Sequence, residues 1–194
     1  GRVEIGENPN EKGVFQSPKS LAPGQSYTGT LTARLPASLP GEYRVIVRTD
    51  IFDDVYEGQY NNNNRLASAS TMTVSVPVLQ LGAPFSDTIS AGEERLYAIV
   101  VPAGETLLIT LDAENDTAAS ELYARFEGLP STLKYDASFE GHLWADQSAK
   151  VPLTAAGTYY ILVRSVSSPA NNPITVKASL MPFGITDVSP DTGG

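Results

Sequence analysis

Hydrophobic and polar residues alternate along most of the chain, and no stretch of ten residues shows the 3.6-residue repeat of an amphipathic helix. In "YTGTLTARL", Tyr27, Leu31, Ala33 and Leu35 face one side, while threonine and arginine face the other. This alternation is typical of a half-buried β-strand. The same pattern predicts an all-β protein with strands over residues 27–35, 43–49, 70–76, 95–101, 106–112, 121–126, 158–165 and 174–180.

Turn sequences rich in glycine and proline separate these strands, and one of them marks a domain boundary. In "PVLQLGAP" (77–84), a proline follows the strand that ends at Val76, and a new strand pattern of acidic composition begins. We therefore expect two consecutive β-sandwich units with a boundary at Pro77. The predicted division is residues 1–77, residues 78–183, and residues 184–194 as a linker or the start of a following domain.

The first unit is short for a complete sandwich. Only about four strands are visible in residues 1–77, whereas an immunoglobulin-like sandwich has ~7. We interpret this unit as a partial, immunoglobulin-like sandwich whose beginning is cut away. The initial glycine and the strand-like "ITDVSP" near the other end are also what a fragment of a longer array would show.

An internal similarity links the two units. "PGEYRVIVRTD" (40–50) and "AGTYYILVRSV" (156–166) share a glycine, a tyrosine two residues later, and a Val-Arg pair followed by Thr or Ser. A glycine turn that leads into a tyrosine-bearing strand is a favourable start for a core strand. Each unit is therefore expected to contain one such central strand.

The first unit also shows a family resemblance. "LAPGQSY", "PGEYRVIVRTD", "VYE" and "NN" follow one another in residues 21–76, before a last strand. This combination resembles the CARDB family, the cell-adhesion-related domains of bacterial secreted proteins, and we assign the resemblance to residues 1–76. Only the C-terminal half of the usual family length is present.

Residues 78–182 resemble the bacterial prepeptidase C-terminal domain through "SAGEERLYAIVVPAGETLLITLDAENDTAASELYARFEG" and "VPLTAAGTYYILVRS". The resemblance implies a jelly-roll-like β-sandwich attached to secreted proteases or surface proteins, with collagen-binding modules of bacterial collagenases as relatives. Calcium-binding members carry an acidic, Asn-rich lead-in and an Asp-x-Asp-x-Tyr turn. This chain has "PVLQLGAPFSD" and "GEERLYA" instead, so the resemblance does not support calcium binding by that route.

Composition narrows the classes of partner and site. The chain of 194 residues has a net charge of −9, which disfavours binding to nucleic acid or anionic lipid. It contains no cysteine, so disulfides and thiolate metal sites are excluded. No apolar run approaches the ~20 residues of a membrane span. Most of the charge imbalance lies in residues 78–194, which hold 6 basic and 14 acidic side chains.

Two polar stretches supply the oxygen ligands that Ca²⁺ requires. The first is "DIFDDVYEGQYNNNN" (50–64), and the second is "DAENDTAASE" (112–121). The alternative is that both are solvated loops, which we favour, because Asn and Asp readily form turns. However, the loop "SVSSPANNP" after the equivalent strand of the second unit turns without a carboxylate, so turning alone does not explain the acids of the first loop. The candidate metal ligands are Asp50, Asp53, Asp54, Glu57, Asn61, Asp112, Glu114 and Asp116.

Catalytic constellations are missing from the sequence. A Ser-His-Asp triad would depend on the single histidine, His142, and no nucleophile-elbow motif is present. Histidine-based zinc sites need more imidazoles than the chain has. We therefore predict that the chain is not an enzyme and that His142 has a surface or partly packed role.

Aromatic residues in or beside loops are the remaining candidates for ligand contact, through stacking on a sugar or packing on a protein. The alternative, which we favour for Trp144, Phe139 and Leu143, is that these residues plug the open end of the second sandwich, because the one Trp of a sandwich is usually a core residue. The candidate ligand-binding residues are Tyr56, Tyr60, Tyr135 and Trp144.

Together these observations predict a non-catalytic structural and adhesion segment of a large secreted or surface-anchored bacterial protein. Its expected partners are an extracellular glycan or a matrix or surface protein, besides covalently linked neighbouring domains; nucleic acid and membrane insertion are not expected. The alternative is a carbohydrate- or collagen-binding module with a calcium-supported site.

Overall fold

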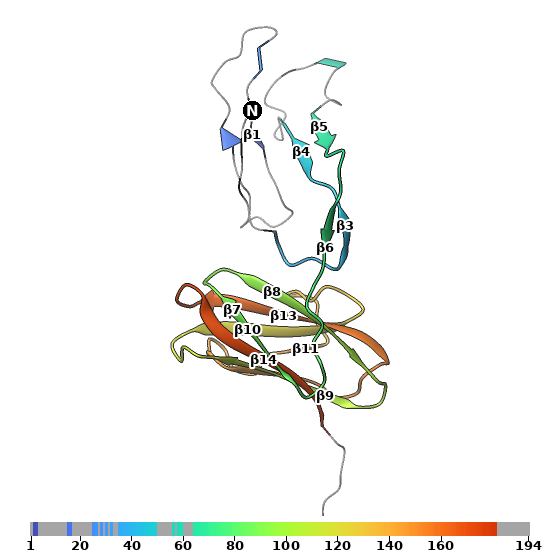
Figure 1. Ribbon diagram of the computed structural model, residues 1–194, viewed down its shortest axis with the longest axis vertical. Helices are drawn as coiled ribbons and strands as arrows, with labels where there is room; N and C mark the ends of the chain where they lie inside the picture. The colour runs from blue at the N-terminus through green and yellow to red at the C-terminus, as the bar shows by residue number, and fades with distance from the viewer. Residues whose placement is uncertain are drawn as a thin grey trace, which may run out of the picture. The chain divides into compact units, whose positions relative to one another are not determined.

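The structure is a computed structural model, and it divides into two compact units, Gly1–Ser75 and Val76–Gly194. The division lies beside the predicted boundary at Pro77. No α-helix occurs in the part of the chain that the structure describes, so no helix there could cross a membrane. The described residues are 2–3, 15–16, 25–26, 28, 30, 32, 35–49, 56, 58–59 and 64–181 (Figure 1).

In the first unit the described strands pair as antiparallel couples: β1 with β2, β3 with β6, and β4 with β5. The last two couples continue one another, because the backbone N–H of Ser68 donates to the carbonyl of Val45 between them, at 2.7 Å. Their bounds are β1 (Arg2–Val3), β2 (Phe15–Gln16), β3 (Gly41–Tyr43), β4 (Ile46–Arg48), β5 (Arg65–Ala67) and β6 (Met72–Val74).

The predicted strands of this unit are found only in part. Residues 43–49 are interrupted at Arg44 and Val45, and residues 70–76 contain the three-residue strand β6. The predicted strand 27–35 lies partly outside the described residues, and none of its described positions is in a strand. Among the described residues, no buried hydrophobic side chain precedes Leu79, so the immunoglobulin-like interpretation of this unit stays a prediction.

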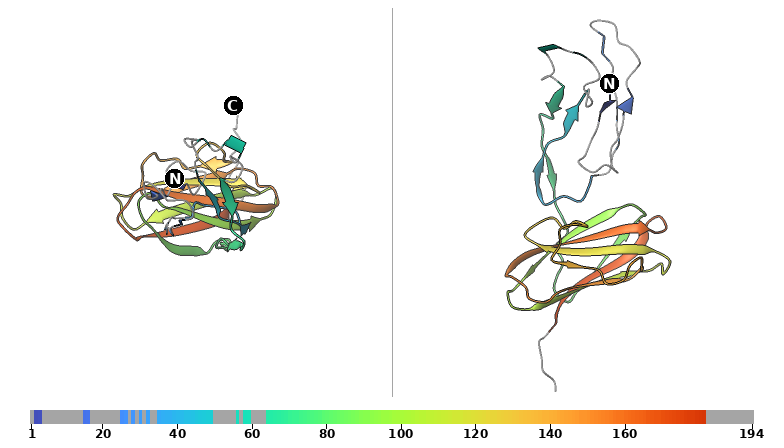
Figure 2. Two further views of the ribbon diagram at one scale, coloured as in Figure 1. Left: turned by 90° about the horizontal axis from the view of Figure 1, so that it is seen from above. Right: turned by 180° about the vertical axis from the view of Figure 1, so that it is seen from behind.

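The second unit is a β-sandwich of two four-stranded antiparallel sheets (Figures 1 and 2). One sheet has the order β11-β10-β13-β8, and the other has the order β12-β9-β14-β7. Except for β10 and β11, consecutive strands alternate between the sheets, as in a jelly roll. Their bounds are β7 (Pro84–Ile89), β8 (Glu94–Val101), β9 (Thr106–Ala113), β10 (Ala119–Phe126), β11 (Ala137–Ser138), β12 (Gln147–Val151), β13 (Gly157–Ser167) and β14 (Asn172–Met181).

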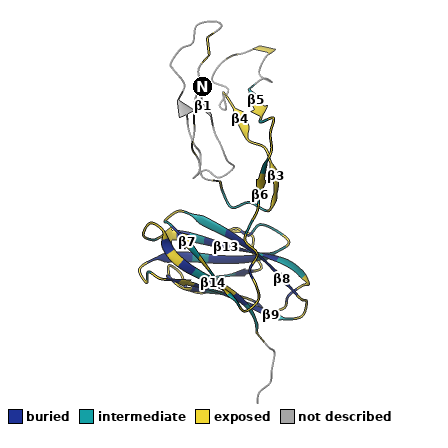
Figure 3. Cartoon of the chain, viewed as in Figure 1, coloured by how far each residue is buried: buried dark blue, intermediate teal, exposed yellow. Residues whose placement is uncertain are grey.

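The core of the second unit follows directly from the period-two pattern. Every second residue of the central strands points between the sheets, and these side chains are buried (Figure 3). The all-β prediction is confirmed, and each of the five strands predicted in this unit corresponds to an observed one. The buried inward residues include Tyr97, Ile99, Leu107, Ile109, Leu111, Ile161, Val163, Ile174 and Val176.

The prediction missed the two edge strands of one sheet, β7 and β12. β7 begins with Pro84 and has one fully buried residue, Ile89, so it carries little hydrophobic signal. β12 has only five residues, "QSAKV", and begins with a glutamine. Edge strands are often short and polar, because such sequences discourage pairing with other chains.

Replacing Ile161 by alanine tests the assignment of the core. Ile161 is fully buried in β13, so the truncated side chain leaves a cavity, and the free energy of unfolding should fall by about 2–5 kcal/mol. Leu153→Ala is the matched control, because Leu153 is 73% exposed, and its effect should stay within about 0.5 kcal/mol. Urea unfolding followed by the fluorescence of the single tryptophan measures both variants. Equal midpoints for the two would contradict the assignment.

Candidate functional site

The first acidic stretch lies almost entirely outside the described residues. Of its candidates, Asp50, Asp53, Asp54, Glu57, Tyr60 and Asn61 are all outside, whereas Tyr56 is described and exposed. The base of the loop is described. The backbone N–H of Thr49 donates to the carbonyl of Asn64 at 2.8 Å, next to the β4–β5 pair. The loop therefore leaves the Val-Arg strand and returns beside it, and calcium binding there stays a prediction.

The second acidic stretch forms a hydrogen-bonded turn between β9 and β10. The side-chain Oδ1 of Asn115 accepts hydrogen bonds from the backbone N–H and the hydroxyl of Thr117, at 2.9 and 2.6 Å. Asp112, Glu114 and Asp116 are exposed, and the structure does not gather them: among the described residues, no three His, Cys, Asp or Glu side chains form a group that could hold a metal ion.

Glu121, the last acid of this stretch, is engaged on the outer face of the sheet. The guanidinium of Arg164 on β13 donates from Nη1 to Glu121 on β10 and from Nε to Glu94 on β8, the latter at 2.8 Å. The three residues are cross-strand neighbours by register. Burial, and then the charge of Glu121, raises the pKa of Tyr123 to about 12. The carboxylate of Glu121 is thus one of two that pair with Arg164 across three strands.

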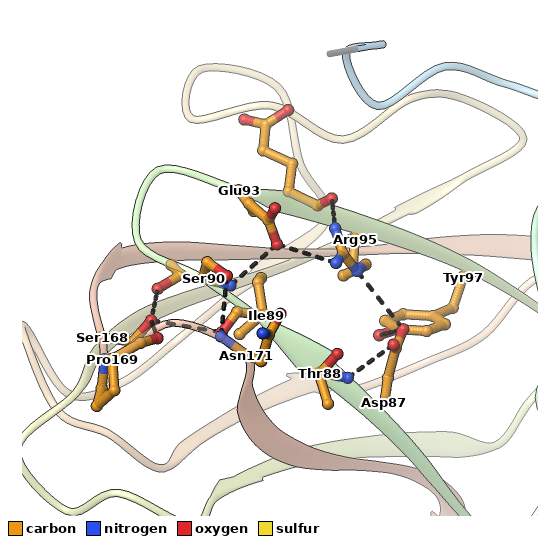
Figure 4. Close-up of polar contacts among 12 residues, drawn as sticks. Asp87, Thr88, Ile89, Ser90, Glu93, Arg95, Tyr97, Ser168, Pro169 and Asn171 are labelled. Carbon is orange, nitrogen blue, oxygen red and sulfur yellow. Dashed lines mark hydrogen bonds and ion pairs between the residues drawn. The ribbon is translucent and has the colours of Figure 1, made fainter.

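The turn after β13 shows that a loop of this kind needs no carboxylate of its own (Figure 4). The backbone N–H of Asn171 donates to the hydroxyl of Ser90 at 3.0 Å, and the hydroxyl of Ser165 donates to that of Ser168 at 2.9 Å. Asn171 adopts a φ of 53°, a left-handed conformation that asparagine tolerates. The inference from "SVSSPANNP" is therefore supported by the geometry of the second unit.

The loop between β11 and β12, residues 139–146, is the most distinctive exposed feature of the second unit. Trp144 is 64% exposed and Leu143 is 54% exposed, so the prediction that they plug the sandwich is wrong. Phe139 does pack against the core, where the small side chains Ala137 and Ala145 are also buried. Because these residues fill the core at this loop, the indole is left on the surface. His142 beside it is exposed, in agreement with its predicted surface role.

The buried amide of Gln147, the first residue of β12, holds this loop. Its Nε2 lies within hydrogen-bond distance of three carbonyl oxygens, those of Ser120, Gly141 and Trp144, at 2.8, 2.6 and 3.0 Å. Two N–H groups serve these three acceptors, so at least one bond is shared. The backbone N–H of Ser120 also donates to the Trp144 carbonyl at 2.9 Å. The loop is thereby fastened to β10 and β12 at both of its ends.

Two local features set the position of the indole. A Cβ at Gly141 would lie 1.9 Å from the nearest atom of the Trp144 ring, so the ring rests directly on the glycine. Leu143 has a φ of 59°, which costs a branched side chain about 1–3 kcal/mol. The fold thus maintains a strained leucine and an exposed tryptophan on a fixed loop. We identify residues 141–144, which we name the Trp144 loop, as the candidate contact site.

Tyr135, the other aromatic candidate in the second unit, lies near the opposite end of β10. Its ring contacts that of Tyr123 with 5.4 Å between the centroids, and 47% of the residue is exposed. Tyr123 also packs edge-on against Phe139, at 5.5 Å. The structure therefore does not bring Tyr135 and Trp144 into one predicted site but places them on separate loops. The Gln147 contacts could not be predicted, because the strand that begins with Gln147 was itself missed.

Gln147→Ala tests whether this side chain fixes the Trp144 loop. The substitution removes the amide and with it the donor to the Gly141 carbonyl, so the free energy of unfolding should fall by about 1–3 kcal/mol. The fluorescence anisotropy of Trp144 should fall as well, because the indole gains freedom of motion. Gln80→Ala is the control, since Gln80 is exposed in the same unit. Unchanged anisotropy in the folded Gln147→Ala variant would show that the loop is held by other contacts.

Part of the second unit matches a described protein family. Residues 93–165 match the family described as the bacterial pre-peptidase C-terminal domain. This match confirms that part of the resemblance stated for residues 78–182, whereas the CARDB resemblance of residues 1–76 stays a prediction. No curated protein matches the chain.

Solved structures of similar shape come from several bacterial proteins. The pre-peptidase C-terminal domain of the Bacillus anthracis collagenase is 13% identical with a TM-score of 0.44, and the alignment covers 54% of this chain and 95% of that domain. The periplasmic g-type lysozyme inhibitor PliG of Aeromonas hydrophila is 15% identical with a TM-score of 0.42, covering 55% and 96%. The surface-associated copper-binding protein CorA of Methylomicrobium album BG8 is 8% identical with a TM-score of 0.38, covering 56% and 98%.

Proposed function

We propose that this chain is a non-catalytic spacing and adhesion segment of a bacterial protein that acts outside the cytoplasm, and that the second unit contacts its partner through the Trp144 loop. The observation that carries the proposal is the exposed indole, held on Gly141 and fastened through Gln147. The match of residues 93–165 to a domain that accompanies peptidases supports both the non-catalytic role and the location.

The size of the Trp144 loop limits the affinity of a single contact. A tryptophan contributes at most ~250 Å² of burial, of which about two thirds is available here. At ~25 cal/mol per Å² this gives about 4 kcal/mol, similar to the lowest estimates of the cost of association. One loop alone therefore binds weakly. Repetition along a parent chain raises the overall affinity by about 10²–10⁴ without new contacts, which fits the proposed adhesive role.

A discrete binding module for a glycan or a collagen-like protein is the second candidate, and the rigid presentation of Trp144 favours it. Aromatic side chains that are already fixed lose little conformational entropy on binding, so they suit a defined ligand. The two candidates differ in valency. A discrete module binds as a single copy, whereas a spacing and adhesion segment binds measurably only when several copies are joined.

Trp144→Ala tests the contact under both candidates. The chain and the variant are displayed as single copies and as tetramers on arrays of extracellular glycans and matrix proteins. The tetramer of the natural sequence should bind at least one class of polymer, and Trp144→Ala should reduce that binding at least about tenfold, because the loop loses its largest apolar surface. Leu153→Ala, which removes an exposed apolar side chain at the other end of β12, should leave it unchanged. Equal binding by Trp144→Ala would contradict the proposal.

We also propose that Ca²⁺ binds the loop of residues 50–64. Four carboxylates in a short loop repel one another, and the turn after β13 shows that acids are not required for turning. Ligand binding to the folded state raises its melting temperature, so millimolar Ca²⁺ should raise that of the first unit by several degrees relative to chelator. The double variant Asp53→Asn, Asp54→Asn should lack this shift. Identical melting curves with and without calcium would exclude the ion.

A further inference from the structure

A pocket lies at the end of β10 that is remote from the Trp144 loop. The segment after β10 folds back beside the strand and leaves a shallow, largely open pocket of about 590 Å³. Its lining combines two cations, an aromatic ring and a hydroxyl. The lining residues are Arg125, Thr132, Leu133, Lys134, Tyr135 and Asp136.

Backbone hydrogen bonds fix the wall of this pocket. The N–H of Ser131 donates to the carbonyl of Lys134 at 2.9 Å, and the Ser131 hydroxyl accepts from the N–H of Lys134 at 3.1 Å, which closes a tight turn. The N–H of Asp136 donates to the carbonyl of Ala124 at 2.8 Å, and its carboxylate accepts from the N–H of Phe126 at 2.7 Å. The turn is thus fastened to β10, and the pocket exists before any ligand arrives.

The charge of this pocket is opposite to that of the unit that carries it. Residues 78–194 hold six basic side chains against 14 acidic ones. Arg95 and Arg164 are committed to ion pairs with carboxylates. Of the other four, Arg125 and Lys134 both line this pocket, and the described residues provide no carboxylate ion pair for either of them.

Arg125 has donor capacity left for a ligand. Its Nη1 donates to the carbonyl of Leu129 at 3.1 Å, which holds the guanidinium at the pocket. A guanidinium has five N–H groups in a planar fork that matches a carboxylate. The ammonium of Lys134 adds a second charge from the facing turn. Asp136, the acid of the pocket, accepts a hydrogen bond from the backbone and keeps its negative charge. The two cations exceed it by one charge, so the pocket favours an anion.

Tyr135 supplies an apolar surface beside these cations. Its ring is supported by Tyr123 and remains 47% exposed, and the neighbouring Leu133 is 90% exposed. The C–H face of a sugar ring packs on such a surface, while its hydroxyls bond to groups such as that of Thr132. A uronic acid carries both properties on one ring, a carboxylate and an apolar face. The acidic side chain of a peptide offers the carboxylate without such a ring face.

We infer that the pocket formed by Arg125, Lys134 and Tyr135 binds the carboxylate-bearing ring of an acidic saccharide. Arg125 and Lys134 bind the carboxylate, and the ring of Tyr135 packs against the apolar face of the sugar. The net charge of the chain opposes long anionic polymers at low salt, but this field is screened over about 8 Å at physiological ionic strength. The net charge of the chain therefore does not prevent an acidic saccharide from binding at that ionic strength. This inference does not rest on the Trp144 loop, because the two features use different segments.

Calorimetric titration of the 194-residue chain with a trisaccharide of galacturonic acid tests the inference. The methyl-esterified trisaccharide is the matched ligand, because it keeps the rings and lacks the charge. The acid should bind with a dissociation constant below the millimolar range, and the ester at least about tenfold more weakly, because the charge-assisted hydrogen bonds are lost. Triglutamate should bind no better than the ester.

Substitutions of the lining residues test whether the saccharide binds in this pocket. Lys134→Gln changes an exposed side chain without disturbing the fold and should weaken binding of the acid at least about threefold, and Arg125→Gln at least about tenfold. Lys150→Gln, which removes an exposed charge from the other sheet, should have no effect, and neither should Trp144→Ala. The inference would be overturned by equal affinity for the acid and the ester, or by unchanged binding in both Lys134→Gln and Arg125→Gln. It would also be overturned if triglutamate bound as well as the acid, or if millimolar trisaccharide released no heat.

Discussion

The closure of two apolar sheet faces on each other is the constraint on which the second unit depends. β13 has the longest ladder in its sheet, with β8 on one side and β10 on the other, and its inward residues Ile161 and Val163 are fully buried. Burying these faces requires strict alternation, since a slip of one residue would turn every inward side chain outward. The connecting loops are released from this packing and carry exposed side chains such as that of Trp144, whereas outward positions such as Leu96 and Leu162 are also buried.

The same constraint explains why the buried polar side chains of the described residues lie in loops or at or near the ends of strands. Gln147 occupies an inward position of β12 but lies at its first residue, where the neighbouring loop supplies carbonyl acceptors. In the middle of the strand that amide would lack partners, and its burial would be costly. At the strand end it joins two elements instead. The polar groups at the turns around Ser90 and Ser168 follow the same logic (Figure 4).

The central strands of the second unit could be predicted because they bury hydrophobic residues at every second position. β7 and β12 could not, because an edge strand such as "QSAKV" shows little of that pattern. The family resemblance of the second unit was also readable, through strand pattern rather than any chemical group. For the first unit, few of the predicted features fall on described residues, and its domain type is not tested by what is described.

The candidate sites were harder to predict, because each depends on contacts between distant segments. Trp144 was assigned to the core from the usual behaviour of a lone tryptophan, but Phe139 and small alanines fill that space. Gly141 could not be recognised as the support of the indole before the fold was known. Arg125 and Lys134 are nine residues apart and meet only because Asp136 fastens the intervening turn to β10.

β10 connects the two exposed features and so limits how they can act together. Its residue Ser120 bonds the Trp144 loop, and its residue Arg125, five positions further along the strand, lines the cationic pocket. At ~3.3 Å per residue, these two positions are about 17 Å apart on a rigid support. A single sugar ring with its substituents cannot span this distance, so the Trp144 loop and the cationic pocket act as independent contacts. A polymer long enough to reach both features would bind the second one at a high effective concentration once it had bound the first. The affinity of such a unit would therefore depend on the length of the polymer more than on the chemistry of any single group.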